Sequence, residues 1–183
     1  MQIVIGFIGV FAIAAFGFMS DNIGTPTVVE SVDLERYMGT WYAVASVPTT
    51  FERACVRGTT AVYELLEDGK VQVTNTCYRD DGSEFQAVGR AWIPNRNEPA
   101  KLKVSFVSLL GWWLFPGDYW ILELDPNYRF AVVGHPKRQY GWILSRTPTL
   151  PEVTLQGIFD RLEDAGYSRA QFRRIDQTIP AGS

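Results

Sequence analysis

Two short stretches decide the fold: Gly39-Thr40-Trp41-Tyr42 near the start of the chain, and Trp142-Ile143-Leu144-Ser145-Arg146-Thr147-Pro148 about a hundred residues later. The first stretch follows Val32 to Gly39, whose apolar spacing predicts a short helical turn closed by a glycine. Trp41 therefore lies at the start of the first predicted strand, and Arg146 at the end of the last predicted barrel strand. Between them the pattern is one of short strands separated by turns.

Eight such strands are predicted before the pattern changes to helical spacing. The strongest pair is a hairpin joined through Glu67-Asp68-Gly69-Lys70, because Asp-Gly is a favoured two-residue turn. Regular short strands with turns between neighbours indicate a sandwich or a closed barrel. The predicted strands are Thr40–Val47, Gly58–Leu66, Val71–Tyr78, Phe85–Ile93, Lys101–Ser108, Tyr119–Leu124, Tyr128–Val133 and Tyr140–Ser145. A helix is predicted over Pro151–Ala165, followed by a last short strand over Gln171–Asp176.

The Gly-x-Trp motif at Gly39 and the Arg motif ending at Pro148 resemble the two signature motifs of the lipocalin family. The segment from Tyr119 to Asp125, continued by Tyr128 to Val133, resembles the family's middle motif, although Leu-Asp-Pro-Asn-Tyr stands where Thr-Asp-Tyr is typical. Pro48 to Arg53 is similar to bacterial outer-membrane lipocalins and the apolipoprotein D group. The resemblance covers about residues 32 to 176. It implies an all-β fold with one C-terminal helix, an eight-stranded antiparallel up-and-down β-barrel over residues 32–178.

The resemblance assigns Gly39, Trp41 and Arg146 to the structure of the barrel rather than to ligand binding. An indole can fill the space where the strands converge, and a guanidinium on its face gains about 0.5–2 kcal/mol by cation–π attraction. The five donors of the arginine can also bind backbone carbonyls of the incoming N-terminal segment.

The side chains that face the barrel interior follow from the alternation of the strands, with Trp41 fixing the inward phase of the first. Many inward positions hold Ala or Gly, which leave volume that a packed core would fill. An eight-stranded barrel can hold one small ligand, so the pattern indicates a cavity for an acyl chain or a ring system. The alternative is that large residues on facing strands fill the gap. The predicted ligand-binding residues are Ala43, Ala45, Ala61, Tyr63, Val73, Asn75, Phe85, Ala87, Gly89, Val104, Phe106, Tyr119, Ile121, Tyr140 and Trp142.

Glu123 shares the inward phase of Tyr119 and Ile121. A buried carboxylate without a partner costs several kcal/mol, so we expect a basic partner or a hydrogen bond to an inner tyrosine. The alternative is a β-bulge that turns Glu123 outward.

The run Leu109-Leu110-Gly111-Trp112-Trp113-Leu114-Phe115 is apolar where a turn between two strands should be polar. The resemblance places it at the open mouth of the barrel. It is interpreted as a lid over the cavity, as a contact with a bilayer, where Trp prefers the interface, or as a patch for self-association into a homodimer. The predicted membrane contacts are Leu110, Trp112, Trp113, Leu114 and Phe115.

The N-terminus predicts export. Gln2 to Met19 is uncharged and almost wholly apolar, so residues 1–19 are interpreted as a cleaved signal peptide or a retained membrane anchor, the remaining alternative being a buried helix, and residues 20–31 as a linker. Cys55 and Cys77 are the only cysteines; in an exported chain they are expected to form a disulfide, the alternative being two buried thiols. The predicted location is periplasmic or associated with the outer membrane.

Composition excludes several classes of function. The 183 residues carry a net charge of −3 with a pI near 5.2, which argues against nucleic-acid binding. No metal, cofactor or catalytic residue is predicted: His135 is the only histidine and is expected to be solvated, and no nucleophile elbow occurs. The predicted function is storage or transport of a fatty acid, lysophospholipid or similar amphiphile at or between membranes. The alternatives are a lipocalin-fold isomerase or pigment-modifying enzyme, or a porphyrin-type carrier.

Overall fold

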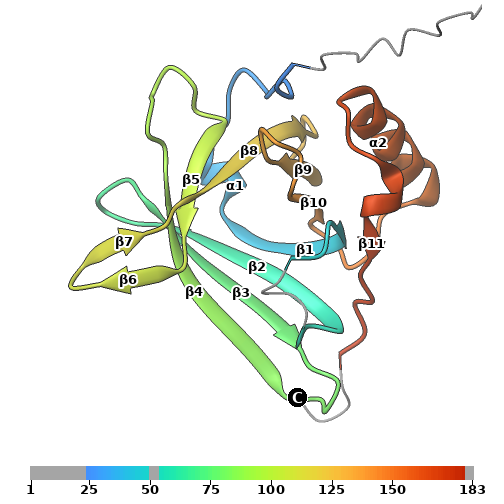
Figure 1. The fold of residues 1–183 in the computed structure, drawn as a ribbon, viewed down its shortest axis with the longest axis horizontal. Coiled ribbons are helices and arrows are strands. Elements are labelled where there is room, and N and C mark those ends of the chain that lie inside the picture. The colour runs from blue at the N-terminus through green and yellow to red at the C-terminus, as the bar shows by residue number, and fades with distance from the viewer. Residues whose placement is uncertain (1–23, 50–53, 180–183) are drawn as a thin grey trace, which may run out of the picture.

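The computed structural model describes residues 24–49 and 54–179, which form a β-barrel flanked by one long helix (Figure 1). The predicted eight-stranded antiparallel barrel is confirmed, and except for the fifth strand the observed ends lie within two residues of the predicted ones. The barrel strands are β1 (Gly39–Ser46), β2 (Arg57–Leu65), β3 (Val71–Tyr78), β4 (Glu84–Trp92), β5 (Lys101–Ser105), β8 (Gly117–Leu124), β9 (Phe130–Gly134) and β10 (Gly141–Ser145).

The barrel is an up-and-down meander that closes on itself. Each strand pairs antiparallel with the next barrel strand along the chain, and β1 pairs with β10 to close the ring. The β2–β3 hairpin turns where the sequence predicts: Gly69 adopts a φ of +76°, which glycine tolerates, and the Leu66 amide donates to the Lys70 carbonyl at 2.8 Å. Closure leaves no free edge along most of the sheet.

The long helix α2 (Glu152–Asp164) packs on the outside of the barrel and buries one apolar stripe against it (Figure 1). Leu155, Ile158, Phe159 and Leu162 from the helix meet outward-facing side chains of β1, β9 and β10 in a second core. After α2, a short 3₁₀ turn (Arg169–Gln171) leads to β11 (Arg173–Arg174), which pairs with β1. The predicted last strand, Gln171–Asp176, is thus shortened to the two residues of β11, after which the Ile175 amide donates to the Val44 carbonyl and Asp176 forms an isolated bridge with Arg57.

The fifth predicted strand, Lys101–Ser108, is divided. β5 ends at Ser105, and after Phe106 the chain enters a separate two-stranded hairpin of β6 (Val107–Leu109) and β7 (Trp112–Leu114). The Ser105 hydroxyl donates to the Leu114 carbonyl at the base of this hairpin. Figure 1 shows β6 and β7 projecting away from the barrel. The apolar run 109–115 is therefore part of a β-hairpin, not an irregular turn.

The stretch predicted as a linker, residues 20–31, packs on the barrel over its described part. Val28 and Val29 lie against the core, and the Val29 amide donates to the Ile121 carbonyl at 3.0 Å. Residues 1–19 and most of the Pro48–Arg53 motif lie outside the described residues. Among the residues that the structure describes, no helix is long and apolar enough to cross a membrane.

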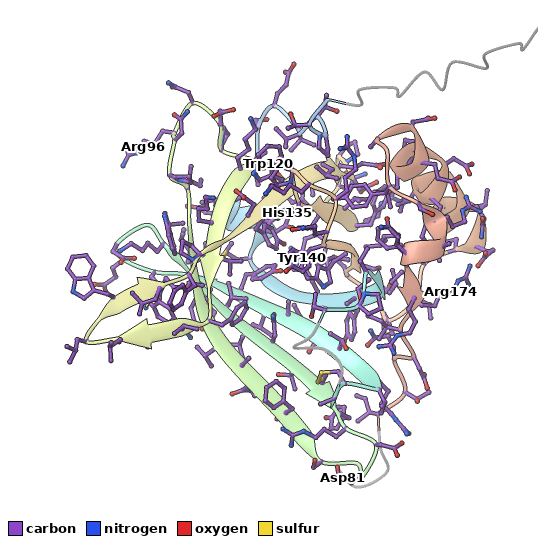
Figure 2. The ribbon with its side chains drawn as sticks, viewed as in Figure 1. Asp81, Arg96, Trp120, His135, Tyr140 and Arg174 are labelled. Atoms are coloured by element: carbon purple, nitrogen blue, oxygen red, sulfur yellow. A yellow bond between two sulfur atoms is a disulfide. The ribbon has the colours of Figure 1, made fainter. Side chains whose placement is uncertain are left out.

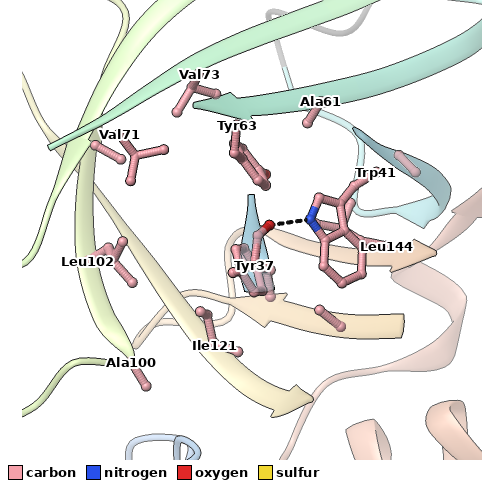
Figure 3. Close-up of a cluster of buried hydrophobic side chains, with 14 residues drawn as sticks. Tyr37, Trp41, Ala61, Tyr63, Val71, Val73, Ala100, Leu102, Ile121 and Leu144 are labelled. Carbon is pink, nitrogen blue, oxygen red and sulfur yellow. Dashed lines mark hydrogen bonds between the residues drawn. The ribbon is translucent and has the colours of Figure 1, made fainter. Parts of the chain in front are cut away.

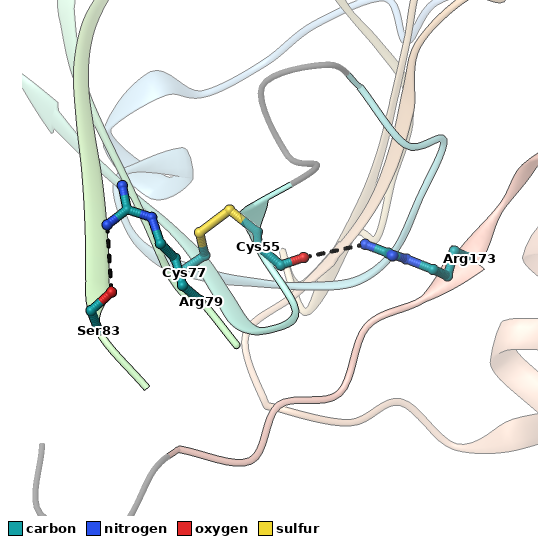
Figure 4. The surroundings of a disulfide bond; sticks show 5 residues. All are labelled: Cys55, Cys77, Arg79, Ser83 and Arg173. Atoms are coloured by element: carbon teal, nitrogen blue, oxygen red, sulfur yellow. Dashed lines mark hydrogen bonds between the residues drawn. A yellow bond between two sulfur atoms is a disulfide. The ribbon is translucent and has the colours of Figure 1, made fainter. Parts of the chain in front are cut away.

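The predicted disulfide is present. Cys55 and Cys77 are bonded with their Cα atoms 5.6 Å apart, and the bond ties the segment before β2 to the end of β3 (Figure 4). Arg173, from the C-terminal segment, donates to the Cys55 carbonyl at 3.5 Å.

Candidate ligand-binding cavity

One end of the barrel is sealed by Trp41, which is fully buried. The short helix α1 (Leu34–Tyr37) crosses this end, and the Trp41 indole N–H donates to the Tyr37 carbonyl at 2.8 Å. The Arg146 guanidinium lies 3.8 Å from the Trp41 ring centroid and donates to the carbonyls of Thr40 and Arg36. Arg146, from the second motif, thus stabilises Trp41, from the first, by cation–π attraction, and it also binds the chain that enters the barrel by hydrogen bonds.

Above this plug lies a cavity of about 110 Å³ inside the barrel. This volume is well below the roughly 300–1,000 Å³ of pockets that bury drug-sized ligands, so the cavity is small. Its walls are predominantly apolar, and several of their side chains belong to the buried hydrophobic cluster drawn in Figure 3. The lining residues are Leu34, Tyr37, Met38, Ala43, Thr59, Thr60, Ala61, Tyr63, Val71, Val73, Asn75, Ala91, Leu102, Val104, Phe106, Asp118, Tyr119, Trp142 and Leu144.

Three tyrosines form the main polar group of the cavity. The Tyr119 hydroxyl lies 2.9 Å from that of Tyr37 and 3.0 Å from that of Tyr63. The rings of Tyr37 and Tyr63 are stacked with centroids 5.7 Å apart, next to Trp41 (Figure 3). Burial raises the pKa of Tyr63 to about 12 and raises the pKa of Tyr37 and Tyr119 as well. The three phenols are therefore neutral at physiological pH.

Asp118 is the charged residue of the lining, and it has a cationic neighbour. Its carboxylate lies 2.8 Å from the Lys103 ammonium, and the His135 Nε2 is 3.8 Å away. His135 was expected to be solvated, but its side chain is mostly buried and packs edge-on against Tyr140 (Figure 2). Desolvation lowers the pKa of His135, although Asp118 opposes this effect.

Nine of the fifteen predicted ligand-binding residues line the cavity: Ala43, Ala61, Tyr63, Val73, Asn75, Val104, Phe106, Tyr119 and Trp142. They come from six barrel strands and from Phe106 just after β5, so the period-two alternation places them on one inner surface. Their role in ligand binding stays a prediction.

Ala45 and Ile121 lie elsewhere. A register shift between Ala43 and Ala45 in β1 turns Ala45 outward, where it is buried in the second core under α2. Ile121 belongs to the barrel core but not to the cavity wall; it is fully buried with Trp41 and Ala100 in the same cluster.

Phe85, Ala87 and Gly89 share the inward face of β4 but lie beyond the cavity wall. β4 pairs with β5 over Arg90 to Trp92, and from Glu84 to Gly89 its described strand neighbour is β3. Because β5 ends at Ser105 and the chain bends at Phe106, no β5 residues lie beside Glu84 to Gly89 to continue the cavity wall there. The Phe106 ring also lies over Gly89, where an added Cβ would approach it to 2.7 Å.

Tyr140 stands before β10 and is partly exposed, outside the cavity lining, with its ring stacked on Trp142. Sequence reasoning missed two lining residues that matter chemically, Tyr37 and Asp118. Tyr37 sits in the helical turn of α1, and Asp118 falls in the part of β8 that precedes the predicted strand. An apolar stripe that continues through a helical turn next to Gly-x-Trp is the signal that could have found Tyr37.

Glu123 does not point into the barrel. A register shift between Ile121 and Glu123 in β8 turns it toward α2, where its carboxylate forms a two-bond ion pair with Arg161 at 2.7 and 3.0 Å. The inward expectation was wrong and the bulge alternative is observed, with the basic partner supplied from the outer helix.

The β6–β7 hairpin carries the predicted membrane contacts. Leu110 is 92% exposed, Trp112 76% and Phe115 86%, whereas Trp113 and Leu114 are half-buried. The Arg90 guanidinium lies 5.6 Å from the Trp113 ring centroid, so Trp113 faces the sheet and Trp112 faces away.

Comparison with known proteins agrees with this architecture. Residues 32–177 match the model of a family described as a lipocalin-like domain. The chain belongs to the lipocalin family. Among curated lipocalin relatives, the outer membrane lipoprotein Blc of Escherichia coli is 37% identical over 91% of this chain and 93% of its own length. Temperature-induced lipocalin-1 of Arabidopsis thaliana is 35% identical over 82% of both chains, and apolipoprotein D of Rattus norvegicus is 37% identical over 72% of this chain and 69% of its own.

Solved lipocalin structures share the fold at lower sequence identity. Insecticyanin from the tobacco hornworm Manduca sexta superposes with a TM-score of 0.66 at 21% identity, covering 85% of each chain. The cockroach allergen Per a 4 gives 0.63 at 20% identity, covering 85% of this lipocalin and 94% of the allergen. At this identity the likeness concerns the fold alone.

Proposed function

We propose that this protein stores or transports a hydrophobic ligand, an acyl chain or similar amphiphile such as a fatty acid or lysophospholipid, at or between membranes. The observation that carries the proposal is the predominantly apolar cavity between the Trp41 plug and the open end of the barrel. Small residues, Ala43, Ala61 and Ala91, leave this space unfilled where a close-packed core would have none. The family membership and the relatives named as lipoproteins support the same class of function.

The enzymatic alternative loses its best nucleophile, because Cys77 is bonded to Cys55. A porphyrin-type carrier fits less well for two reasons. The cavity is small, and His135 is not among its lining residues. We therefore favour binding without catalysis.

The site of action that we propose is the cell envelope. Residues 1–19 carry the apolar character of an export signal or an anchor, a disulfide suits an oxidising compartment, and the bacterial relatives are named outer membrane lipoproteins. In this arrangement residues 20–31 lead from the N-terminal segment into the lipocalin domain, residues 32–178.

The proposed membrane contact is the β6–β7 hairpin. It leaves the barrel at the open end and presents Leu110, Trp112 and Phe115 to the surroundings. Apolar side chains and tryptophan at the tip of a projecting element are suited to the lipid interface. A carrier that dips this hairpin into a bilayer exchanges its ligand without exposing it to water. Self-association of two copies through the same surface is the competing proposal.

Native mass spectrometry of the protein purified from its own membrane fraction tests the function. We expect an apolar ligand to remain bound and to be released on unfolding, and the same spectrum gives the processed mass of the chain. Recovery of unliganded protein that also fails to bind Nile red, an uncharged lipophilic fluorophore, would contradict the proposal.

A further inference from the structure

The hydroxyl groups of Tyr37, Tyr63 and Tyr119 form a cluster inside a predominantly apolar cavity. They come from α1, β2 and β8, three elements far apart in the sequence, and all three side chains line the cavity. The Tyr119 hydroxyl is the centre of the cluster, since both hydroxyl–hydroxyl contacts involve it, at 2.9 Å and 3.0 Å.

The cluster has more hydroxyl protons than it has hydrogen bonds between its hydroxyl groups. Each phenol carries one hydroxyl proton, and each hydroxyl–hydroxyl contact uses one proton. Two contacts use two of the three protons, whichever way they point. One hydroxyl proton is left over, and among the described residues no other acceptor is hydrogen-bonded to any of the three oxygens. A buried donor without an acceptor is costly, so the cluster favours whatever brings an oxygen to it.

The charge around the cluster limits what that oxygen can be. Arg146 is the nearest cation, but it lies against the Trp41 ring and its donors bind the carbonyls of Thr40, Arg36 and Tyr128. Asp118 is the charged residue that lines the cavity, and it is negative. A carboxylate or phosphate brought to the tyrosines would be buried without a free cationic partner.

We propose that the tyrosine cluster is a binding subsite for an uncharged oxygen acceptor, so that the ligand enters the barrel with a neutral carbonyl or hydroxyl group leading and its hydrocarbon chain toward the mouth. This inference rests on the proposed function, because it names the ligand class of the same cavity. The raised pKa of the phenols keeps them protonated, as a donor requires. Long-chain ketones, aldehydes and alcohols have the required chemistry. The carboxylate group of an ionised fatty acid does not, so within the proposed class of amphiphiles the cluster favours the neutral members.

The test uses two ligands of equal shape. One is a long-chain methyl ketone, and the other is its methylene analogue, in which the C=O group is replaced by C=CH₂. Both compete with Nile red for the intact protein, and the ionised fatty acid of the same length is compared at about pH 8. We expect the ketone to compete about five- to tenfold better than the methylene analogue, the size of one net hydrogen bond, and better than the carboxylate. The carbonyl stretching band of the bound ketone should move to lower frequency.

Variants locate the effect. Replacing all three tyrosines by Phe keeps the rings and removes the hydroxyls, so the ketone preference and the frequency shift should both disappear. Tyr42→Phe is the matched control, because Tyr42 lies on β1 next to Trp41 and therefore faces out of the barrel. It should leave the preference unchanged. If the triple variant fails to fold, the comparison of ketone and methylene analogue on the native protein still decides.

Equal competition by the ketone and the methylene analogue would overturn the inference and leave the proposed function standing, since an apolar ligand would still bind. The same holds if the ketone preference survives in the triple variant, or if the carboxylate binds more tightly than the ketone. If Nile red, the ketone, the methylene analogue and the fatty acid all fail to bind, the proposed function itself is overturned.

Discussion

At the scale of single residues, Trp41 and Arg146 hold the closed end together and leave the cavity to other side chains. Trp41 is the largest fully buried side chain of the barrel, and Arg146 joins its ring to the backbone of α1 and β1. Gly39 fits between them: its φ of +90° favours glycine, and an added Cβ would meet the Arg146 guanidinium at 3.4 Å. These residues are expected to act through stability.

Trp41→Ala is expected to lower the free energy of unfolding by about 3–5 kcal/mol, because it leaves a cavity under the barrel. Arg146→Ala should also destabilise, since it frees the carbonyls of Thr40 and Arg36. Urea unfolding measures both, with Trp112→Ala as the control because Trp112 is largely exposed. Full stability of the first two variants together with loss of Nile red binding would show that the pair serves the ligand instead.

Asp125 makes stability depend on acid pH. Its carboxylate accepts hydrogen bonds from the Arg129 guanidinium at 2.7 and 2.9 Å and from the amides of Asn127 and Arg129. The Arg129 side chain, opposed by desolvation, lowers the pKa of Asp125 from 3.8 to about 2. A carboxyl with a lowered pKa in the folded state contributes stability above its unfolded pKa, and that contribution is lost as the pH falls from 3.8 toward 2.

Asp125→Asn should therefore remove part of the loss of stability between about pH 4 and pH 2. The expected difference is about 1 kcal/mol, reduced because Arg129 is open to solvent. Unfolding free energies of the native protein and the variant are compared across this range. Identical pH profiles would show that other carboxyl groups cause the acid sensitivity.

At the scale of elements, the strands and the Trp–Arg closure could be predicted from alternation and motifs, but the irregularities could not. In β1, Ala43 to Ser46 are all buried, so nothing in the pattern marks the register shift that turns Ala45 outward. In β8, the charge of Glu123 at a position expected to face inward did indicate an irregularity, and the register shift after Ile121 turns this side chain outward. The bend at Phe106 depends on a tertiary contact, the Ser105 hydroxyl to the Leu114 carbonyl, that local sequence does not contain.

The candidate cavity shows the same division. Residues of unbroken strands, such as Ala61, Val73 and Asn75, line it as alternation predicts. Phe85 and Ala87 do not line it, because β5 pairs with β4 only from Arg90 to Trp92 and does not extend beside these two residues. The hydroxyl cluster forms where three elements meet, and strand alternation cannot predict the contribution of α1, because α1 is a helical turn and not a barrel strand.

The disulfide restrains the open end of the barrel. It joins Cys55 and Cys77, which are 22 residues apart (Figure 4). The segment around Cys55 also contacts the C-terminal residues: Arg173 donates to the Cys55 carbonyl, and the Gly58 amide donates to the Asp176 carbonyl. The Cys55→Ala/Cys77→Ala variant is expected to lose about 3 kcal/mol of stability, the cost of releasing a loop of this length in the unfolded chain.

Urea unfolding of this double variant, beside the native protein with and without reductant, measures the effect. Neither cysteine lines the cavity, so Nile red affinity should change little at protein concentrations where the variant is folded. An unchanged midpoint would contradict the stabilising role, and a loss of affinity without a loss of stability would place the bond in the binding site.

At the scale of the whole molecule, apolar surface is concentrated at one place. Half of the large exposed hydrophobic side chains in the described chain fall within residues 106–115, whereas the rest are scattered singly. Figure 1 shows the β6–β7 hairpin projecting from the barrel on the side away from α2. An arm in this position does not cover the cavity, which disfavours the lid and leaves a lipid surface or a second copy of the chain as its partner.

The membrane proposal predicts a separable effect on vesicle binding. A chain that begins at Gly24 keeps the contacts of Val28 and Val29 and lacks the N-terminal apolar segment, so any binding to phospholipid vesicles must come from the folded domain. Leu110→Ser/Trp112→Ser should weaken this binding roughly tenfold or more, since each side chain forfeits part of the 1.5–3 kcal/mol of its burial.

Val153→Ser is the matched control, because Val153 is 81% exposed on α2, away from the hairpin. It should leave vesicle binding unchanged, and neither variant should alter Nile red affinity, since Leu110, Trp112 and Val153 do not line the cavity. Unchanged vesicle binding with a collapse of Nile red affinity would make the hairpin a lid. A native dimer that the hairpin variant dissolves, with vesicle binding unaffected, would instead assign this surface to self-association, because the same apolar side chains would then be buried against a second copy rather than in lipid.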